Sequence, residues 1–479
     1  MELFRADAKR VSIHRAEKLL LWCMSAHLVF LPWALGTMHL WSQLVSLALS
    51  CAGFTLSLVP RHYMEDPTGS PSFRLVMWPR LLKFPIFWLG LALLLLVTIQ
   101  ALNPSWRYTT DGKAWWMSKI TSHITWLPAG VDVPFDKGGP WRQLIIYSSA
   151  WLTVCTLWVG FTRRRVLQTL LVVLGGNGVL LAGFGVIQNA LGNGKIFWTR
   201  ISPNDFFFAS FIYKNHAGAY LLLTLAICAG LGAWYYLRGL RRLEKSNPSG
   251  LFAFFALGIA AASFVSYARG ATLIMVVFLT GWAAVFVAQQ FMLKRTKRAL
   301  FGTVALLAIF GLFLKTGAET AHSREAWNRL IRGLNSQDQS LEAREWATAA
   351  AGAMLSDHWK AGVGAGSFQF LFPVYQHRDP RLVTSGGAPL FWDHAHNDLL
   401  EIPIELGLMG FGLLVAMIGY LAVTLVRCAF WRNPLSGSLV FGTLLLVVYA
   451  RWDFPLQCPA ILITGCTLLA ASALWVRFE

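Results

Sequence analysis

FPIFWLGLALLLLVTIQAL, residues 84–102, is an apolar run that contains no charged side chain. A helix needs about 20 such residues to cross a bilayer. Similar runs recur from end to end of the 479-residue chain, which is 56% hydrophobic and only 13% charged. A soluble protein carries about 25% charged residues. The sequence therefore predicts an all-α polytopic membrane protein.

We expect twelve transmembrane helices with cytoplasmic termini. Basic residues gather in every second connection between the runs, which the positive-inside rule assigns to the cytoplasm. The first run precedes further spans directly and lacks a small-residue cleavage site, so it is predicted to be a membrane helix. The expected spans are approximately 18–36, 39–59, 84–102, 142–161, 166–188, 217–237, 251–268, 271–291, 299–315, 399–426, 436–452 and 458–476.

The net charge of +18 follows this alternating pattern. Membrane topology therefore accounts for the basicity better than binding to nucleic acid does. The seven cysteines all fall inside apolar runs and contain no CxxC pair, which favours small hydrophobic side chains over a disulfide framework.

Two of the predicted non-cytoplasmic connections are long, and the second of them separates the bundle into two parts. Residues 1–315 form its first part, with a tryptophan-rich interfacial segment at 103–141, and residues 399–479 form its second part. Between them, residues 316–398 are predicted to form a folded, helical periplasmic loop. SREAWNRLIRGL and SLEAREWATAAAGAML have helical periodicity, and KAGVGAGSFQFLFPVYQ follows as a glycine-rich turn and an aromatic segment.

The polar residues that topology does not explain collect on the non-cytoplasmic face. A transporter tends to keep ionisable groups near the bilayer centre, whereas an enzyme acting on a lipid-linked substrate needs them at the interface. Their distribution favours the enzyme. These residues are Lys214, Asn215, His216, Arg269, Arg344, Arg378, His394, His396, Asn397, Arg451 and Asp453.

This set of residue types suits the transfer of a group from a diphosphate. Arginine and lysine side chains bind phosphate oxygens, and a neutral histidine can take a proton from a hydroxyl. Each residue also has an ordinary interpretation, because Arg269 and Lys214 can anchor helix ends and His216 can bond the backbone. A metal site at His394 and His396 is a further alternative, although two histidines two residues apart are poor joint ligands.

The stretch HAHNDLLEIPIELGLMG, residues 394–410, separates into structural and chemical parts. Asn397 can cap the following helix, and Asp398 and Glu401 suit the positive end of its dipole. Pro403 is expected to kink the helix, and Gly407, Gly410 and Gly412 to permit close helix packing. Capping does not explain His396.

Several of these segments resemble the O-antigen ligase and polymerase superfamily. His396-Asn397, followed by Gly407 and Gly410, is similar to the family pattern H-[NSQ]-x9-G-x-x-[GTY], and RGATL at 269–273 to R-x3-L. KNHAGAY at 214–220 and HWKAGVGAGSFQFLFPVYQ at 358–376 resemble segments of exopolysaccharide members, although Tyr213 replaces their first asparagine. The resemblance covers roughly residues 200–410 in motifs and the whole chain in topology.

The resemblance implies a glycosyltransferase of GT-C type in the bacterial inner membrane. It would transfer a glycan from undecaprenyl diphosphate to an acceptor hydroxyl in the periplasm, without a metal or other cofactor. His396 would be the general base or would orient the acceptor, and Arg269 and Lys214 would bind the diphosphate. The other implied substrate-binding residues are Arg344, Arg378, Asn215, His216, Asn397 and His394.

The acceptor stays open between lipid A–core, as in a ligase, and another lipid-linked glycan, as in a polymerase. KNHAGAY and GVGAGSF modestly favour a polymerase of exopolysaccharide type. The alternatives are a protein O-oligosaccharyltransferase and a transporter of polysaccharide or lipid-linked sugar.

Overall fold

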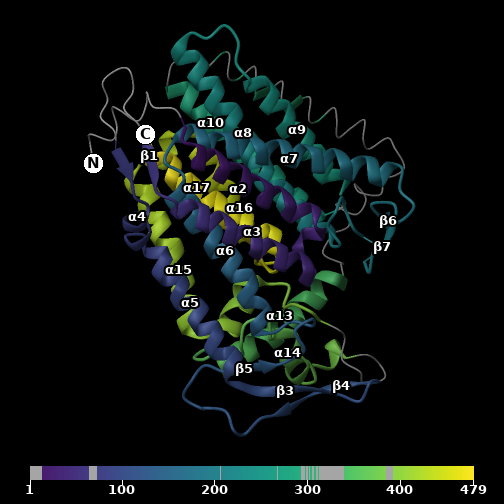
Figure 1. Cartoon of the computed structure of the whole chain (residues 1–479). Helices are drawn as coiled ribbons and strands as arrows, with labels where there is room; N and C mark the ends of the chain where they lie inside the picture. Colours follow the sequence, from purple (N-terminus) through teal and green to yellow (C-terminus); the bar gives the residue numbers. More distant parts are fainter. Residues whose placement is uncertain are drawn as a thin grey trace.

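The computed structural model describes residues 13–63, 73–204, 206–266, 268–292, 339–383 and 392–478, with a few isolated residues between 297 and 311. In this part of the chain, helices form a bundle that carries strands and short helices at one end (Figure 1). The bundle helices are α2 (Arg15–Trp33), α3 (Leu40–Leu58), α5 (Pro85–Leu102), α6 (Pro140–Gly160), α7 (Arg164–Ala190), α8 (Lys214–Arg242), α9 (Ser249–Val265), α10 (Arg269–Met292), α15 (Asp398–Arg427), α16 (Pro434–Tyr449) and α17 (Pro459–Arg477).

Eight of the described helices are long and apolar enough to cross a membrane, and α9 and α16 are apolar but shorter. This confirms a multi-pass helical membrane protein, while the number of twelve spans stays a prediction. Most predicted spans match a helix within a few residues. The predicted span 299–315 and the segment SREAWNRLIRGL lie largely or wholly outside the described residues.

Helix α8 is the centre of the bundle. Of the residues in its most apolar stretch, 94% are buried inside the protein. The corresponding share is 17% for α15 and 33% for both α3 and α5. Small residues allow this central position. A side chain at Gly218 would lie 2.3 Å from the Cβ of Ala271 on α10, and one at Gly230 would lie 2.9 Å from Ser438 on α16. The start of α8 is therefore fixed against several neighbouring helices, which matters for the site.

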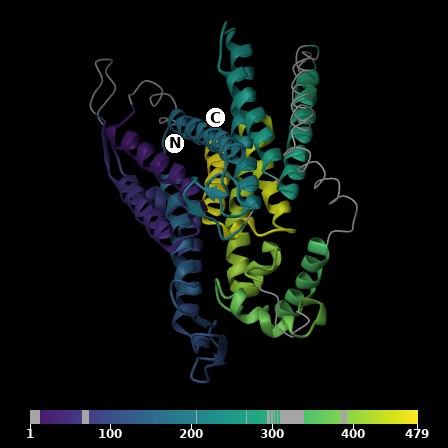
Figure 2. The same cartoon turned by 90° about the vertical axis from the view of Figure 1, so that its right-hand side faces the viewer.

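The two ends of the bundle differ. Residues 103–139, 339–383 and 392–397 gather at one end, called the insert end. The start of α2 and the end of α17 lie at the opposite end, called the terminal end (Figure 2). Side-chain contacts agree with this view of the terminal end. Near the last turn of α6, Glu17 accepts a hydrogen bond from Thr162, and Arg477 lies over the Trp158 ring.

The insert end contains a small sheet that the sequence did not predict. Strand β3 (Pro104–Thr110) pairs antiparallel with β4 (Trp115–Lys119) and parallel with β5 (Gly130–Asp132). Next to it lie α13 (Gln339–His358), α14 (Phe368–Gln376) and the 3-10 helix η2 (Pro380–Leu382). The sheet, these helices and α15 share an apolar core that includes Val131, Phe372 and Ile404.

The remaining described elements are short and connect the helices. They are η1 (Leu35–Thr37), α4 (Trp78–Leu82), η3 (Phe430–Arg432), η4 (Pro455–Gln457), the pair β1 (Arg61–Tyr63) and β2 (Phe73–Leu75), and the pair β6 (Lys195–Ile196) and β7 (Arg200–Ile201). All seven cysteines are free thiols.

Candidate active site

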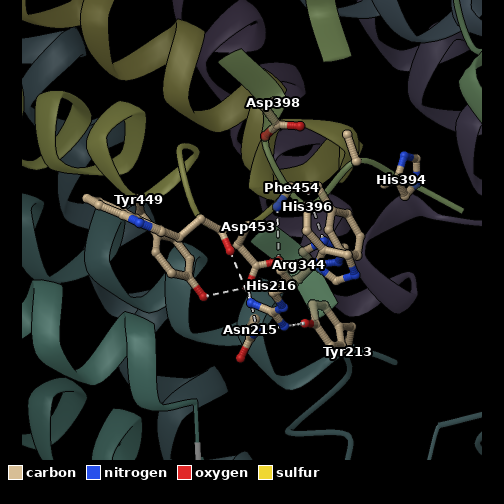
Figure 3. A network of polar contacts seen from close by, with 12 residues as sticks. Tyr213, Asn215, His216, Arg344, His394, His396, Asp398, Tyr449, Asp453 and Phe454 are labelled. Atoms are coloured by element: carbon tan, nitrogen blue, oxygen red, sulfur yellow. Dashed lines mark hydrogen bonds and ion pairs between the residues drawn. The ribbon is translucent and has the colours of Figure 1, made fainter. Parts of the chain in front are cut away.

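A buried carboxylate, Asp453, lies at the centre of a polar network at the insert end (Figure 3). It stands between α16 and η4 and is 1% exposed. Its Oδ2 accepts hydrogen bonds from the Tyr449 hydroxyl at 3.0 Å and from the Asn215 amide, and its Oδ1 accepts one from the Phe454 N–H at 3.0 Å. A buried charge needs such partners, so these donors support an ionised Asp453.

Two basic side chains approach this carboxylate. Arg344 Nη1 lies 3.9 Å from Asp453 Oδ2, and His396 Nδ1 lies 3.6 Å from Asp453 Oδ1. Burial by itself raises the pKa of Asp453, but His396 and Arg344 outweigh burial and hold that pKa below its ordinary value. Asp453 is therefore negatively charged at neutral pH.

Arg344 joins the inserted helices to the bundle. It projects from α13, and its guanidinium donates to the Trp452 carbonyl at 3.0 Å and to the Tyr213 hydroxyl at 3.3 Å. Burial lowers the pKa of Arg344, but Asp453 and Tyr213 raise it above its ordinary value. The sequence placed Arg344 among the site residues, and the structure brings it within ion-pair distance of Asp453.

His396 occupies a strained position just before α15. Its φ of +50° lies in the left-handed region, which is unusual for a side chain other than glycine. The ring packs edge-on against Phe454 and Trp392, with centres 4.7 and 5.4 Å apart. Burial lowers the pKa of His396, and the nearby Asp453 only partly opposes this. The imidazole is therefore neutral at neutral pH and can accept a proton.

His394, two residues away, is in the opposite protonation state. Its Nδ1 lies 2.7 Å from Glu401 Oε1, and the other oxygen of Glu401 accepts a hydrogen bond from the Ala395 N–H at 2.7 Å. Burial lowers the pKa of His394, but the Glu401 carboxylate more than compensates and raises it to about 9. The site thus contains one neutral and one cationic imidazole.

The Phe454 ring packs against the aromatic side chains around Asp453. It stacks on His394 at 4.7 Å and on Tyr213 at 5.3 Å, measured between ring centres, and contacts His216 edge-on at 5.0 Å. His216 is 3% exposed, and its Nε2 lies 3.3 Å from the Phe454 carbonyl. His216 therefore positions the backbone of the Asp453 segment, in agreement with its ordinary interpretation.

Lys214 and Arg269 are the first residues of α8 and α10. Lys214 Nζ lies 4.3 Å from the centre of the Phe206 ring. A side chain at Gly270 would lie 2.7 Å from the Tyr449 ring, so the residue after Arg269 packs directly against a donor to Asp453. Two cations thus begin two adjacent helices, whose N-terminal ends favour anions.

Arg378 lies apart from this network. Its Nη1 is 3.9 Å from Asp357 Oδ2, and its guanidinium lies 4.6 Å from the centre of the Tyr375 ring. The side chain is 60% exposed. The structure therefore does not place Arg378 beside Asp453.

The start of α15 differs from the expected cap. Within the described residues, the Asn397 side chain makes no capping hydrogen bond, and its backbone carbonyl accepts the N–H groups of Leu400 and Glu401 instead. Asp398 Oδ2 accepts a hydrogen bond from the Leu456 N–H at 2.7 Å. The two acids of the first turn therefore bind neighbouring segments besides matching the helix dipole. Glu401 binds His394, and Asp398 binds the backbone of Leu456.

The backbone of the glycine-rich turn at 361–367 binds a side-chain carboxylate of α15. Glu405 accepts hydrogen bonds from the N–H groups of Gly366 at 2.9 Å and Phe368 at 3.0 Å. The next turn of α15 is broken at Gly407, whose φ of +64° and ψ of −174° are non-helical. A side chain at Gly407 would lie 2.6 Å from the Gly362 backbone nitrogen.

The three glycines expected to permit close helix packing have different roles. Gly407, rather than Pro403, breaks α15, and it allows contact with the turn rather than with a helix. Gly410 does face a helix, because a side chain there would lie 2.9 Å from Leu96 on α5. A side chain at Gly412 would meet no described atom within 4 Å, which gives that glycine no packing role here.

Sequence reasoning noted Asp453 but did not place it at the centre of the site. It missed Glu401 as the partner of His394, noted Tyr213 only as a departure from the family segment, and did not name Tyr449 or Phe454. The usable signal was an acid between two apolar runs, in RWDFP at 451–455, because an acid at a membrane interface needs a partner. The aromatic residues have no such signal in a chain with 22 Trp and 33 Phe.

Comparison with known families agrees with the motifs. Residues 252–415 match the family model described as O-antigen ligase, a segment that contains Arg269, Arg344 and His396. No curated protein matches the chain closely enough to count as a relative. This family match agrees with the resemblance inferred from the sequence and supports membership of the O-antigen ligase superfamily.

Proposed function

We propose that the protein is an inner-membrane glycosyltransferase that moves a glycan from undecaprenyl diphosphate to an acceptor hydroxyl at the periplasmic face. Membership of the superfamily supports lipid-linked glycan substrates in a membrane setting. The observation that carries the proposal is the Asp453 network, in which a neutral His396 and a cationic Arg344 face one buried carboxylate.

His396 is the proposed general base. Asp453 faces Nδ1 and favours the tautomer that carries its proton there, which leaves Nε2 to accept the proton of the acceptor hydroxyl. As the hydroxyl oxygen forms its bond to the anomeric carbon of the donor glycan, His396 becomes an imidazolium. The Asp453 carboxylate stabilises that cation, as the carboxylate of an Asp–His pair does in general.

The diphosphate is the proposed leaving group. The bond between the anomeric carbon and the diphosphate oxygen breaks, and undecaprenyl diphosphate departs with the electron pair. Arg269 and Lys214 at the helix starts, with the cationic His394, would stabilise the charge that develops on that oxygen. Lysine lacks the bidentate fork of arginine, so Arg269 is the main proposed contact.

The acceptor is proposed to be another lipid-linked glycan, as in an exopolysaccharide-type polymerase. KNHAGAY and GVGAGSF carry this preference, although the structure gives GVGAGSF a role in binding Glu405. Transfer to lipid A–core is the second candidate, because the matching family model is described as O-antigen ligase.

The test is transfer in vitro by the full-length protein in lipid nanodiscs. With a defined undecaprenyl-diphosphate glycan, the wild type should release undecaprenyl diphosphate and lengthen the acceptor at an unchanged rate in EDTA. His396→Ala should lower the rate by about 10²- to 10⁴-fold, the usual contribution of a general base. Lys245→Gln, an exposed change beyond α8, is the matched control and should keep the wild-type rate.

Three outcomes would contradict parts of this proposal. Full activity of His396→Ala would remove its role as the base, and loss of activity in EDTA would contradict metal independence. If no transfer occurred while labelled glycan crossed sealed vesicles, the protein would be a transporter. Product analysis separates the acceptors, since a polymerase gives longer lipid-linked glycan and a ligase gives glycan on lipid A–core.

A further inference from the structure

A large cavity lies at the terminal end of the bundle, away from Asp453. Its volume is about 980 Å³, it is open to the outside of the protein, and it is lined by the first turns of α7, the last turns of α8 and the junction of η3 with α16. The proposed transfer uses none of its lining residues. Six of them are arginines, namely Arg164, Arg165, Arg238, Arg241, Arg242 and Arg432.

Aromatic rings hold two of these arginines in place. The guanidinium carbon of Arg164 lies 4.1 Å from the centre of the Trp475 ring, and that of Arg238 lies 5.3 Å from the Trp234 ring. The two tryptophan rings contact each other edge to face, with centres 5.4 Å apart. Stacking engages the flat face of a guanidinium and not its in-plane donors, which are the groups that bind phosphate.

The charges of this cavity are poorly balanced. Its described lining residues include neither aspartate nor glutamate. One of the six arginines, Arg238, has an acid beside it, because its Nε lies 3.7 Å from Glu244 Oε1. Elsewhere at the same end, by contrast, the buried Arg61 has Glu17 at 2.9 Å. Clustered like charges repel one another, so an anion with several charges would stabilise the cavity.

Size and position indicate which anion fits. The cavity lies where helices begin and end, which the predicted topology places at the cytoplasmic head groups, and Trp234 and Tyr235 line it as interfacial aromatic residues do. Basic pockets between helices on the cytoplasmic side suit anionic head groups. A single phosphate would fill a small part of about 980 Å³, whereas two phosphates joined by a glycerol would reach several arginines.

We propose that this arginine-lined cavity binds the two-phosphate head group of an anionic phospholipid of the cardiolipin type. The competing explanation is the positive-inside rule, which accounts for basic residues anywhere at this end. That rule is satisfied by basic residues scattered over this end. It does not require six arginines to line one cavity together with aromatic side chains. The two explanations therefore differ in whether the location of the charges matters.

The experiment measures lipid binding to the full-length protein by native mass spectrometry. Cardiolipin, phosphatidylglycerol and phosphatidylethanolamine are offered separately, and inorganic pyrophosphate is the soluble probe. The cavity variant carries Arg165→Gln, Arg241→Gln and Arg432→Gln. The control variant carries Lys83→Gln, Lys245→Gln and Arg427→Gln, which removes three exposed charges next to helix ends outside the cavity lining.

We expect the wild type to bind cardiolipin about tenfold more tightly than phosphatidylglycerol. The cavity variant should lose cardiolipin affinity on the order of 100-fold. The control variant should lose no more than roughly threefold, because its charges do not line the cavity and salt screens them from a ligand bound there. Equal losses in the two variants, or a wild type without preference for cardiolipin, would overturn the proposal. So would pyrophosphate binding as tight as that of cardiolipin, because the occupant would then be a soluble diphosphate. The wild-type measurements decide the matter even if the cavity variant fails to fold.

Discussion

Arg344 at the insert end and Arg164 at the terminal end are held in different ways. Arg344 lies 3.9 Å from the Asp453 carboxylate, which also faces His396. Arg164 stacks 4.1 Å from the Trp475 ring in a cavity whose described lining contains no acid. An acid among the cations fixes protonation states, as proton transfer requires. Six arginines in a described lining that contains no acid favour the binding of an anion. The two ends are therefore suited to different tasks.

Asp453→Asn should have the largest effect on the transfer rate. The neutral amide cannot stabilise the imidazolium of His396, and it also leaves Arg344 without its carboxylate partner. We expect the transfer rate to fall by about 10³-fold. Since Asp453 raises the pKa of His396 against the effect of burial, the acidic limb of the pH–rate profile should also move to lower pH. A normal rate would show that Asp453 serves only the fold.

Glu17→Gln tests the ion pair that the terminal end does contain. Glu17 and Arg61 are fully buried at 2.9 Å, and Glu17 also accepts hydrogen bonds from Thr162. The change leaves a buried guanidinium without its counter-charge, so we expect a loss of about 3 kcal/mol in the free energy of unfolding. The measurement is thermal unfolding in detergent, with the double variant Glu17→Gln/Arg61→Met expected to recover most of the loss. An unchanged midpoint would contradict the importance of this pair.

Glu401→Gln should sharpen the difference between the two histidines. With a folded-state pKa of about 9 against an ordinary 6.5, His394 adds stability that is complete below pH 6.5 and is lost as pH rises through about 9. In the variant, the largest influence that raises the pKa is removed and burial still lowers it, so His394 should be mostly neutral at pH 8. Loss of this cation should slow transfer about tenfold at pH 8 and much less at pH 6. An equal slowing at both pH values would show a structural defect instead.

The membrane helices could be predicted because length and hydropathy alone determine them. Residues 84–102 differ from α5 (Pro85–Leu102) by one residue. The sheet β3–β5 could not be predicted, because its parallel pairing joins Arg107 to Asp132 across an intervening strand. The break at Gly407 was also hidden, since it depends on the backbone of Gly362, which is distant in the sequence.

The site could be predicted in part. His396, Arg344 and Asn215 come from motifs, and the structure gathers them around Asp453. The opposite protonation states of His394 and His396 had no local signal, because one depends on Glu401 in the next helix turn and the other on burial in the assembled bundle. Motifs thus identify residue types, whereas the packed partners set their charge.

The smallest effect is expected at Arg378, the weaker of the two loop arginines that the resemblance implied. Arg344 donates to Trp452 and Tyr213 and faces Asp453, whereas Arg378 is 60% exposed and pairs with Asp357. Arg344→Ala should lower kcat/KM by about 10²-fold, because it removes the cation beside the base and its carboxylate. Arg378→Ala should change it by no more than about twofold, since an exposed ion pair contributes little. Comparable losses in the two variants would mean that Arg378 reaches the substrate when donor and acceptor are bound, and the insert end would then extend its cationic surface well beyond Asp453.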